Sequence, residues 1–240
     1  MNTRHQLFIQ SPHSKDVSDF FHIFNTPNIL NVIYWEKYFD MIKNIEGDIV
    51  ECGVGRGRSL LTILALESLF RTFDDYIPKG IHALDSFEGF PEPTAEDISP
   101  RKTQKGEWSQ SPNGQFNYSI SNLHQIIRNA GIQESLHDEL ILIKGFFDET
   151  VHQIAAPKIA LLHLDSDLYL SIKTPLATLA DKISIGGIVV LDDYLLHDAN
   201  QESEPFPGAR RAVNEFLQSR TDFEQRISVR GTPYLVRTTA

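Results

Sequence analysis

The fold is decided by the stretch Gly47-Asp48-Ile49-Val50-Glu51-Cys52-Gly53-Val54-Gly55-Arg56-Gly57-Arg58-Ser59. Its apolar run predicts a buried strand, its glycines predict a tight turn, and the apolar residues that follow predict a helix. Because Gly53, Gly55 and Gly57 carry no Cβ atom, a ligand can approach the backbone and the first amides of that helix. We interpret the stretch as a nucleotide-type cradle. The alternative is that the glycines only let the helix pack closely on the strand.

Two features of the cradle favour an adenosyl sulfonium over a dinucleotide as its ligand. Glu51 stands two residues before the first glycine, where its carboxylate would repel a pyrophosphate, and the glycine spacing is GxGxG rather than GxGxxG. A carboxylate suits the positive sulfonium of S-adenosylmethionine (SAM). We therefore expect SAM as the cofactor. Two alternatives stay open: an NAD-dependent nucleotide-sugar-modifying enzyme on a Rossmann sheet, and a noncatalytic SAM-binding protein.

Length and composition indicate one ordinary globular domain over residues 46–240, preceded by a helical extension over residues 1–45. The chain has 22 Lys and Arg against 32 Asp and Glu, and its net charge of −10 disfavours nonspecific binding to nucleic acid or acidic membranes. The single cysteine, Cys52, excludes an intrachain disulfide and is expected to be buried. With no membrane-length apolar run and no signal-peptide core, we expect a cytoplasmic protein; homo-oligomers stay open.

Near-continuous apolar runs alternate with helical patterns along the domain. This alternation predicts an α/β fold, in which helices cover both faces of a mostly parallel sheet. The last part of the chain predicts a helix near 209–220 and strands near 223–229 and 234–236. The expected strands and helices before it lie at 28–43 (helix), 58 onward (helix), 81–85, 122–130 (helix), 140–143, 159–165, 168–182 (helix) and 188–193.

The segment from Ser86 to Tyr118 has no periodicity and is rich in Pro, Ser, Glu and Gly. It is too long for an ordinary connection between elements. An active-site lid and a partly disordered insertion are the two interpretations, and the aromatic residues of the segment favour a lid that orders on ligand binding. The basic cluster Arg101, Lys102 and Lys105 is either a solvated part of this loop or a contact for a phosphate-bearing substrate.

Acidic residues stand at the ends of two expected strands. Asp165 ends one strand, and Asp192 and Asp193 end the next. Because parallel strands joined by a crossover helix commonly lie side by side, these acids should meet at the sheet edge that faces the cradle. Three oxygen ligands without cysteine favour a hard cation such as Mg²⁺ or another divalent ion. The alternative is that the acids cap the turns and helices that follow them.

The remaining polar residues near strand ends have simpler interpretations. Asp85 ends the strand after the cradle helix, where an acid can accept hydrogen bonds from ribose hydroxyls. His163 lies within an apolar strand and is expected to be a core histidine with a satisfied ring. His197, just beyond the paired acids, is better placed to contact a substrate.

Four motifs resemble those of the macrocin O-methyltransferase (TylF/MycF-like) family of metal-dependent sugar O-methyltransferases. The resemblance covers roughly residues 46–218. The Asp-Ser-Phe-x-Gly-Phe-Pro and Asp-x-Asp-Leu-Tyr motifs are its most specific parts. The motifs are Gly47-Asp48-Ile49-Val50-Glu51-Cys52-Gly53-Val54, Asp85-Ser86-Phe87-Glu88-Gly89-Phe90-Pro91, Leu164-Asp165-Ser166-Asp167-Leu168-Tyr169 and Gly186-Gly187-Ile188-Val189-Val190-Leu191-Asp192-Asp193-Tyr194.

The resemblance implies the class I SAM methyltransferase fold, a Rossmann-like sheet of seven mostly parallel strands whose last strand is antiparallel. It also implies methyl transfer to a hydroxyl of a sugar or of a glycosylated or phosphorylated natural product. Asp165, Asp192 and Asp193 would hold Mg²⁺, and Asp165 would be the general base. The expected SAM contacts are Glu51, Cys52, Gly53, Val54, Gly55, Ser59, Asp85, Ser86, Phe146 and Asp165.

The chain departs from the family pattern at two positions. Gly55 stands where the family usually has an aromatic residue, which would reshape the methionine end of the SAM pocket. Leu170 stands where the family often has an acid after the Leu-Tyr pair. The second departure bears on which small-molecule acceptor the chain takes.

Overall fold

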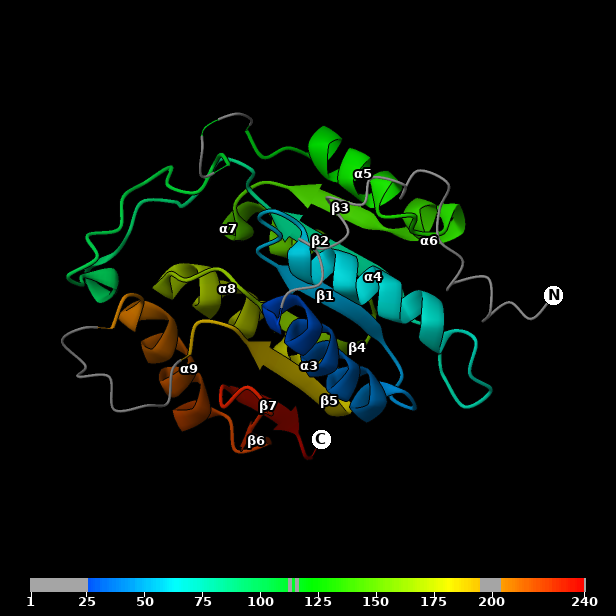
Figure 1. Ribbon diagram of the computed structural model, residues 1–240. Coiled ribbons are helices and arrows are strands. Elements are labelled where there is room, and N and C mark those ends of the chain that lie inside the picture. Colours follow the sequence, from blue (N-terminus) through cyan, green and yellow to red (C-terminus); the bar gives the residue numbers. More distant parts are fainter. Residues whose placement is uncertain (1–25, 112–113, 115–116, 195–203, 240) are drawn as a thin grey trace.

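The computed structural model describes residues 26–111, 114, 117–194 and 204–239. A twisted seven-stranded sheet runs through the centre of the molecule, with helices on both of its faces (Figure 1). The strand order is β3-β2-β1-β4-β5-β7-β6, and only β7 runs antiparallel to its neighbours. The strands are β1 (Asp48–Cys52), β2 (Ile81–Asp85), β3 (Ile141–Lys144), β4 (Ile159–Leu164), β5 (Ile183–Leu191), β6 (Phe223–Ile227) and β7 (Pro233–Arg237).

The central strands are buried because helices cover both faces of the sheet. Every residue of β4 is buried, as its near-continuous apolar sequence predicts. Neighbouring residues of β1 point to opposite faces, so Ile49 joins one hydrophobic cluster and Val50 joins the other. The expected α/β sheet, with its last strand antiparallel, is therefore confirmed.

Each face of the sheet has its own set of helices. One face packs against α3 (Thr26–Ile42), α4 (Arg58–Phe70), α5 (Ile120–Asn129) and α6 (Glu134–Glu139). The other face packs against α8 (Tyr169–Leu179), α9 (Pro207–Ser219) and the 3₁₀ turn η2 (Val151–Gln153). Three short elements complete the chain: η1 (Ala95–Asp97), α7 (Phe147–Thr150) and η3 (Ala180–Lys182). No described helix is long and apolar enough to cross a membrane.

One strand starts earlier than the sequence pattern predicts. The expected strand begins at Ile188, whereas β5 begins at Ile183 and contains the pair Gly186-Gly187, which precedes the expected strand. Ile183 pairs with Ile159 of β4, and the pairing register shifts before Leu161. Gly186 has a φ of 81°, which is the backbone geometry that a bulge of this kind requires.

The expected helical extension is described only in part. Helix α3 lies close to the predicted range 28–43, and residues 1–25 lie outside the described residues. The aromatic side chains of α3, among them Trp35, Tyr38 and Phe39, are buried in the core on the α4 face. This helix is therefore part of the domain core and covers the sheet directly.

Candidate active site

A cavity of about 690 Å³ opens beyond the carboxyl ends of β1, β2, β3 and β4. This is the edge of an open α/β sheet where ligands commonly bind, and the size is typical of small-molecule sites. Most of the expected SAM contacts line it. They are Gly53, Val54, Gly55, Ser59, Asp85, Ser86, Phe146 and Asp165.

Two glycines of the cradle have different reasons to be glycine. At Gly53, a Cβ atom would lie 1.8 Å from the backbone oxygen of Asp165, so this position needs glycine for packing. At Gly55, a Cβ atom would meet nothing within 4 Å, although the φ of 52° disfavours a side chain. Gly53 is thus needed for close packing against the backbone after β4 and not against the helix, whereas Gly55 leaves open space at the cavity wall.

The Asp85 carboxylate fixes the shape of the cradle. Its Oδ2 atom accepts hydrogen bonds from the amides of Val54 and Gly55, both at 2.8 Å, and its Oδ1 atom accepts one from Phe87 at 2.6 Å. The sequence suggested Asp85 only as a partner for ribose. Its role in holding the turn was missed, because the two segments are 30 residues apart in the chain.

Glu51 and Cys52 are not among the residues that line the cavity. The Glu51 side chain is fully buried and its Oε1 atom lies 3.0 Å from Nδ1 of His163, whose ring packs edge-on against Trp35. Burial opposes protonation of His163, but the hydrogen bond to Glu51 and the negative charges of Glu51, Asp165 and Asp192 together outweigh it and raise the histidine pKa. Glu51 therefore sits beneath the cradle, and direct contact of its carboxylate with SAM is not supported by this arrangement.

The smaller expectations for this region have mixed outcomes. His163 is a buried core histidine, as predicted. Cys52 is fully buried, and burial raises the pKa of its thiol, so it behaves as a small apolar residue. His197 lies outside the described residues.

The predicted acids do meet. Asp165, Asp192 and Asp193 each offer a carboxylate oxygen, and these oxygens lie within 4.8 Å of one another. Burial, followed by the charges of Asp193 and Asp192, raises the pKa of Asp165 well above its ordinary value. Within the described residues, no hydrogen bond reaches the Asp165 carboxylate. Three hard oxygen ligands with mutual repulsion fit a divalent cation, so the donor set agrees with the expected Mg²⁺ site.

Asp193 holds the turn that follows β4, which lies before it in the chain and is not the following turn that the capping alternative named. Asp193 accepts hydrogen bonds from the amides of Ser166, at 3.1 Å, and Asp167, at 2.8 Å. Asp167 is buried with a φ of 61°, and burial next to Asp193 raises its pKa to about 10. No role was predicted for Asp167, although it lies within the Asp-x-Asp-Leu-Tyr motif. The Asp-x-Asp spacing, which places Asp167 close to Asp165, was the sequence feature that could have indicated a role for it.

Asp192 has a partner that the sequence analysis missed. Arg230, in the turn between β6 and β7, forms a hydrogen-bonded ion pair with the Asp192 carboxylate. The guanidinium also lies over the ring of Tyr34, 5.8 Å from its centroid. Nothing in the spacing of Arg230 along the chain indicates this contact.

Described residues of the segment from Ser86 to Tyr118, among them Phe90, Trp108 and Tyr118, line one side of the cavity, which we call its outer wall. The ribbon of residues 86–111 extends beyond the carboxyl ends of the strands (Figure 1). Asp97 of η1 attaches this segment to α8, because its Oδ1 atom accepts a 2.7 Å hydrogen bond from the amide of Tyr169. Trp108 is 55% exposed, lines the cavity and has a φ of 63°. Whether the segment is a lid that orders on ligand binding stays a prediction.

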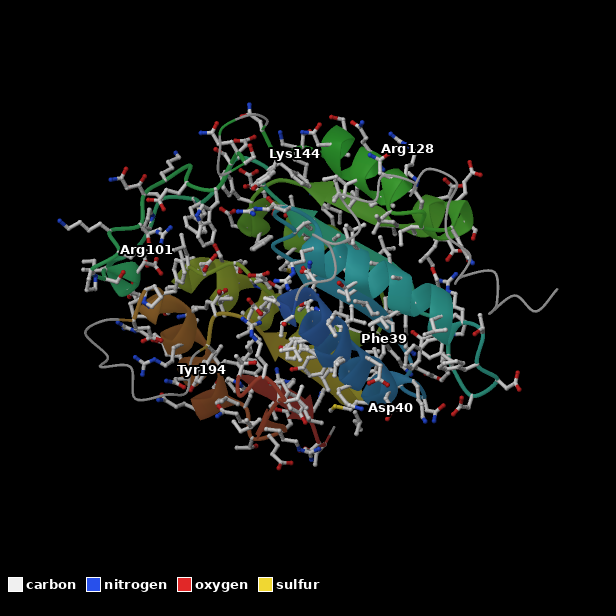
Figure 2. The ribbon with its side chains drawn as sticks, viewed as in Figure 1. Phe39, Asp40, Arg101, Arg128, Lys144 and Tyr194 are labelled. Atoms are coloured by element: carbon white, nitrogen blue, oxygen red, sulfur yellow. The ribbon has the colours of Figure 1, made fainter. Side chains whose placement is uncertain are left out.

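The basic cluster divides, because Lys102 and Lys105 are exposed whereas Arg101 is partly buried, and contact with a phosphate-bearing substrate stays a prediction. The Arg101 side chain lies on the outer-wall segment (Figure 2), pairs with Glu107 at 2.6 Å and stacks among three aromatic rings. Its guanidinium carbon lies 5.0 to 5.7 Å from the ring centroids of Phe90, Trp108 and Phe206. Arg101 therefore stabilises the outer wall through its ion pair and its contacts with the aromatic rings.

Comparison with protein families agrees with this site. A family model described as Macrocin-O-methyltransferase (TylF) matches residues 39–221. The chain belongs to the macrocin O-methyltransferase family. The family that the four motifs resemble is thereby confirmed, and the matched range contains the cradle, the acid cluster and the outer wall.

Three named relatives are O-methyltransferases from Streptomyces and Micromonospora. A tetracenomycin rhamnosyl 4'-O-methyltransferase of Streptomyces olivaceus is 29% identical over 63% of this chain and 54% of its own length. The demethyldecarbamoylnovobiocin O-methyltransferase of Streptomyces niveus is 26% identical over 72% of this chain and 59% of its own length. The mycinamicin III 3''-O-methyltransferase of Micromonospora griseorubida is 25% identical over 72% and 61%. The chain thus matches less than two thirds of the length of these relatives.

Solved structures share the fold. The calicheamicin methyltransferase CalS11 superposes with a TM-score of 0.72 at 20% identity, covering 98% of this chain and 91% of its own. The O-methyltransferase NovP gives a TM-score of 0.63 at 24% identity, covering 85% and 79%. The fold is therefore that of the class I SAM methyltransferases, as the motifs implied.

Proposed function

We propose that this chain transfers a methyl group from SAM to a hydroxyl group of a sugar-containing small molecule, with the help of Mg²⁺ or another divalent cation. The observation that carries the proposal is that the glycine cradle lines the same cavity as Asp165, the member of the acid cluster that reaches it. The family and its O-methyltransferase relatives support the reaction. A noncatalytic SAM-binding protein would have no reason to gather three acids beside its cofactor.

The cradle would bind SAM along the wall formed by β1, β2 and the start of α4. Gly55 leaves room for close approach, and Asp85 holds the turn while exposing a carboxylate edge to the cavity. Three amides already occupy acceptor positions of Asp85, which leaves about one of its four lone pairs for a ribose hydroxyl. Ser86 and Phe146 lie on the same wall and complete the set.

The acid cluster would hold the metal through Asp165, Asp192 and Asp193. When bound, the cation would orient the acceptor hydroxyl and lower its pKa. Of the three acids, only Asp165 is among the residues that line the cavity, so it is the one placed to meet the acceptor. We assign it as the general base that takes the hydroxyl proton while the methyl group moves in line from sulfur to oxygen.

The outer wall suits a sugar-containing acceptor. Sugar rings carry apolar C–H faces that pack on aromatic side chains, and the half-exposed Trp108 offers such a face inside the cavity. Leu170, which is 49% exposed, lines the same cavity in the first turn of α8. The name of one relative refers to a rhamnosyl compound, which agrees with this assignment.

The test is an assay with methyl-labelled SAM and a panel of rhamnosides and related glycosides. Label should appear in a glycoside, disappear with EDTA and return with added Mg²⁺, because the acids need the cation to activate the hydroxyl. SAM affinity, measured by calorimetry, should stay within about twofold in EDTA. Undiminished transfer in EDTA would remove the metal from the proposal. Binding of NAD without binding of SAM would favour the nucleotide-sugar alternative.

A further inference from the structure

Arg230 stands out because it is the cation paired with the acid cluster in the described structure. It lies in the tight turn between β6 and β7, where the amide of Gly231 donates to the oxygen of Ser228 at 3.0 Å. The amide of Arg230 donates to the Ser228 hydroxyl at 3.2 Å. These backbone contacts fix the turn and leave the Arg230 side chain to reach Asp192.

The fold itself brings this turn to the acids. Strand β7 pairs antiparallel with β5, with Val190 opposite Tyr234, so the start of β7 lies beside the carboxyl end of β5. Asp192 follows β5 directly, and the turn that carries Arg230 precedes β7 directly. The ion pair therefore forms between two positions that the sheet register places side by side.

The ion pair bears on the metal because Arg230 uses the same carboxylate that the cation needs. Asp192 is one of three acids whose oxygens lie within 4.8 Å of one another, and the guanidinium donates to its Oδ1 atom. A guanidinium in this position repels an incoming divalent cation and competes with it for Asp192. The Arg230 side chain is 49% exposed, so it can turn toward solvent without being stranded in the interior.

We propose that Arg230 is a built-in counter-cation, which holds Asp192 while the metal site is empty and is displaced when a divalent cation binds. This inference rests on the metal site of the proposed function and adds a residue that competes with the metal. It implies that removal of the Arg230 charge strengthens metal binding, whereas a residue that only positions Asp192 for the metal would weaken binding when removed.

Mn²⁺ binding, followed by electron paramagnetic resonance of the free ion, separates these cases without a methyl acceptor. Arg230→Gln should bind Mn²⁺ about fivefold or more tightly than the wild type, because it removes both the repulsion and the competing ion pair. Arg230→Lys keeps the positive charge and should stay within about twofold of the wild type. The matched control is Arg226→Gln, on β6, whose exposed partner is Glu224 at 2.9 Å, and it should not change the affinity.

The outcomes distinguish this inference from the proposed function. If Asp192→Asn and the wild type both fail to bind Mn²⁺, the metal site itself is wrong. If the wild type binds Mn²⁺ and Arg230→Gln binds it equally or more weakly, the counter-cation role is wrong and the metal site stands.

A second measurement uses the wild-type chain and so does not depend on whether Arg230→Gln folds. The Nε–H signal of Arg230, assigned by its absence from Arg230→Lys, should shift as Mg²⁺ is added. An unchanged signal at saturating Mg²⁺ would overturn displacement.

Discussion

The glycine cradle and the acid cluster, which reaches the same cavity through Asp165, differ in how their polar groups are satisfied. In the cradle, the Asp85 carboxylate accepts three backbone hydrogen bonds, and the turn is held without any ligand. In the cluster, the Asp165 carboxylate accepts none within the described residues, and burial beside two other acids raises its pKa. A preformed site thus stands next to one that a cation would complete.

The two regions therefore differ in what they need in order to bind a ligand. The cradle can receive SAM with little rearrangement, because its backbone is already fixed. The cluster gathers three carboxylates within 4.8 Å, which is unfavourable unless positive charge or protons balance them.

The largest effect is expected at Asp165. Asp165→Asn should lower the methyl-transfer rate by about 10²–10⁴, the usual loss for a general base or a metal ligand. SAM affinity should change far less, because the cradle is built without this side chain. Turnover measured with labelled SAM and affinity measured by calorimetry give the two numbers. Asp138→Asn, on α6 and outside the cavity, is the control, and near-normal turnover of Asp165→Asn would leave the acids as structural caps.

Gly53 and Gly55 of the cradle provide the next comparison. Gly53→Ala should destabilise the fold by about 3 kcal/mol, because its Cβ atom would overlap the backbone oxygen of Asp165. Gly55→Ala has open space for the Cβ atom, so it should lose only about 1 kcal/mol for its φ of 52° and should mainly weaken SAM binding. Urea unfolding and calorimetry measure these effects. Equal loss of stability in both variants would contradict the assignment of Gly55 to the ligand side.

Substitutions in the outer wall should change the binding of the acceptor and should not change the affinity for SAM. Trp108→Ala should raise the KM for a glycoside acceptor about tenfold, since loss of stacking on an aromatic ring costs roughly 1 kcal/mol or more. Trp108→Phe keeps a ring and should recover most of this loss. Ile98→Ala, in the same segment, is 79% exposed and outside the cavity lining, so it should behave as the wild type. An unchanged KM in Trp108→Ala would indicate that the acceptor binds to another wall of the cavity.

The smallest effect concerns stability alone. His124 on α5 lies 2.6 Å from His137 on α6, and burial, followed by the neighbouring His137, lowers the pKa of His124. The unfolded chain therefore binds a proton more readily than the folded chain, so stability is lost as pH falls below about 6.5 toward the lowered pKa. Thermal unfolding between pH 7.5 and 5.5 should show this loss, and His124→Gln should reduce it. The affinity for SAM should be the same in His124→Gln as in the wild type.

Much of the sheet could be predicted from sequence because burial leaves a continuous apolar pattern. Strand β4 is a near-continuous apolar run, interrupted by His163, and it ends within one residue of its predicted end. The start of β5 was missed because Ser184 and the Gly186-Gly187 pair interrupt the apolar pattern there. Pairing with β4 extends β5 through this interruption. Such pairing joins residues that are distant in the chain, so the local sequence does not predict it.

The same limit applies to the site. Asp165, Asp192 and Asp193 could be predicted together, because each follows a parallel strand and the carboxyl ends of such strands share an edge. The buried pairing of Glu51 with His163 could not, since it joins positions 112 residues apart and depends on side chains pointing to the same sheet face. A carboxylate near a glycine turn looks the same in sequence whether it faces a ligand or the core.

The burial of Cys52 makes the chain convenient for site-specific labelling. It is the single cysteine, and its raised pKa and full burial keep the thiolate scarce and out of reach of thiol reagents at neutral pH. An introduced cysteine such as Ile98→Cys would therefore take one fluorophore on the outer wall without a background label elsewhere. Motion of that wall could then be followed in solution in single molecules, with the native thiol left in place.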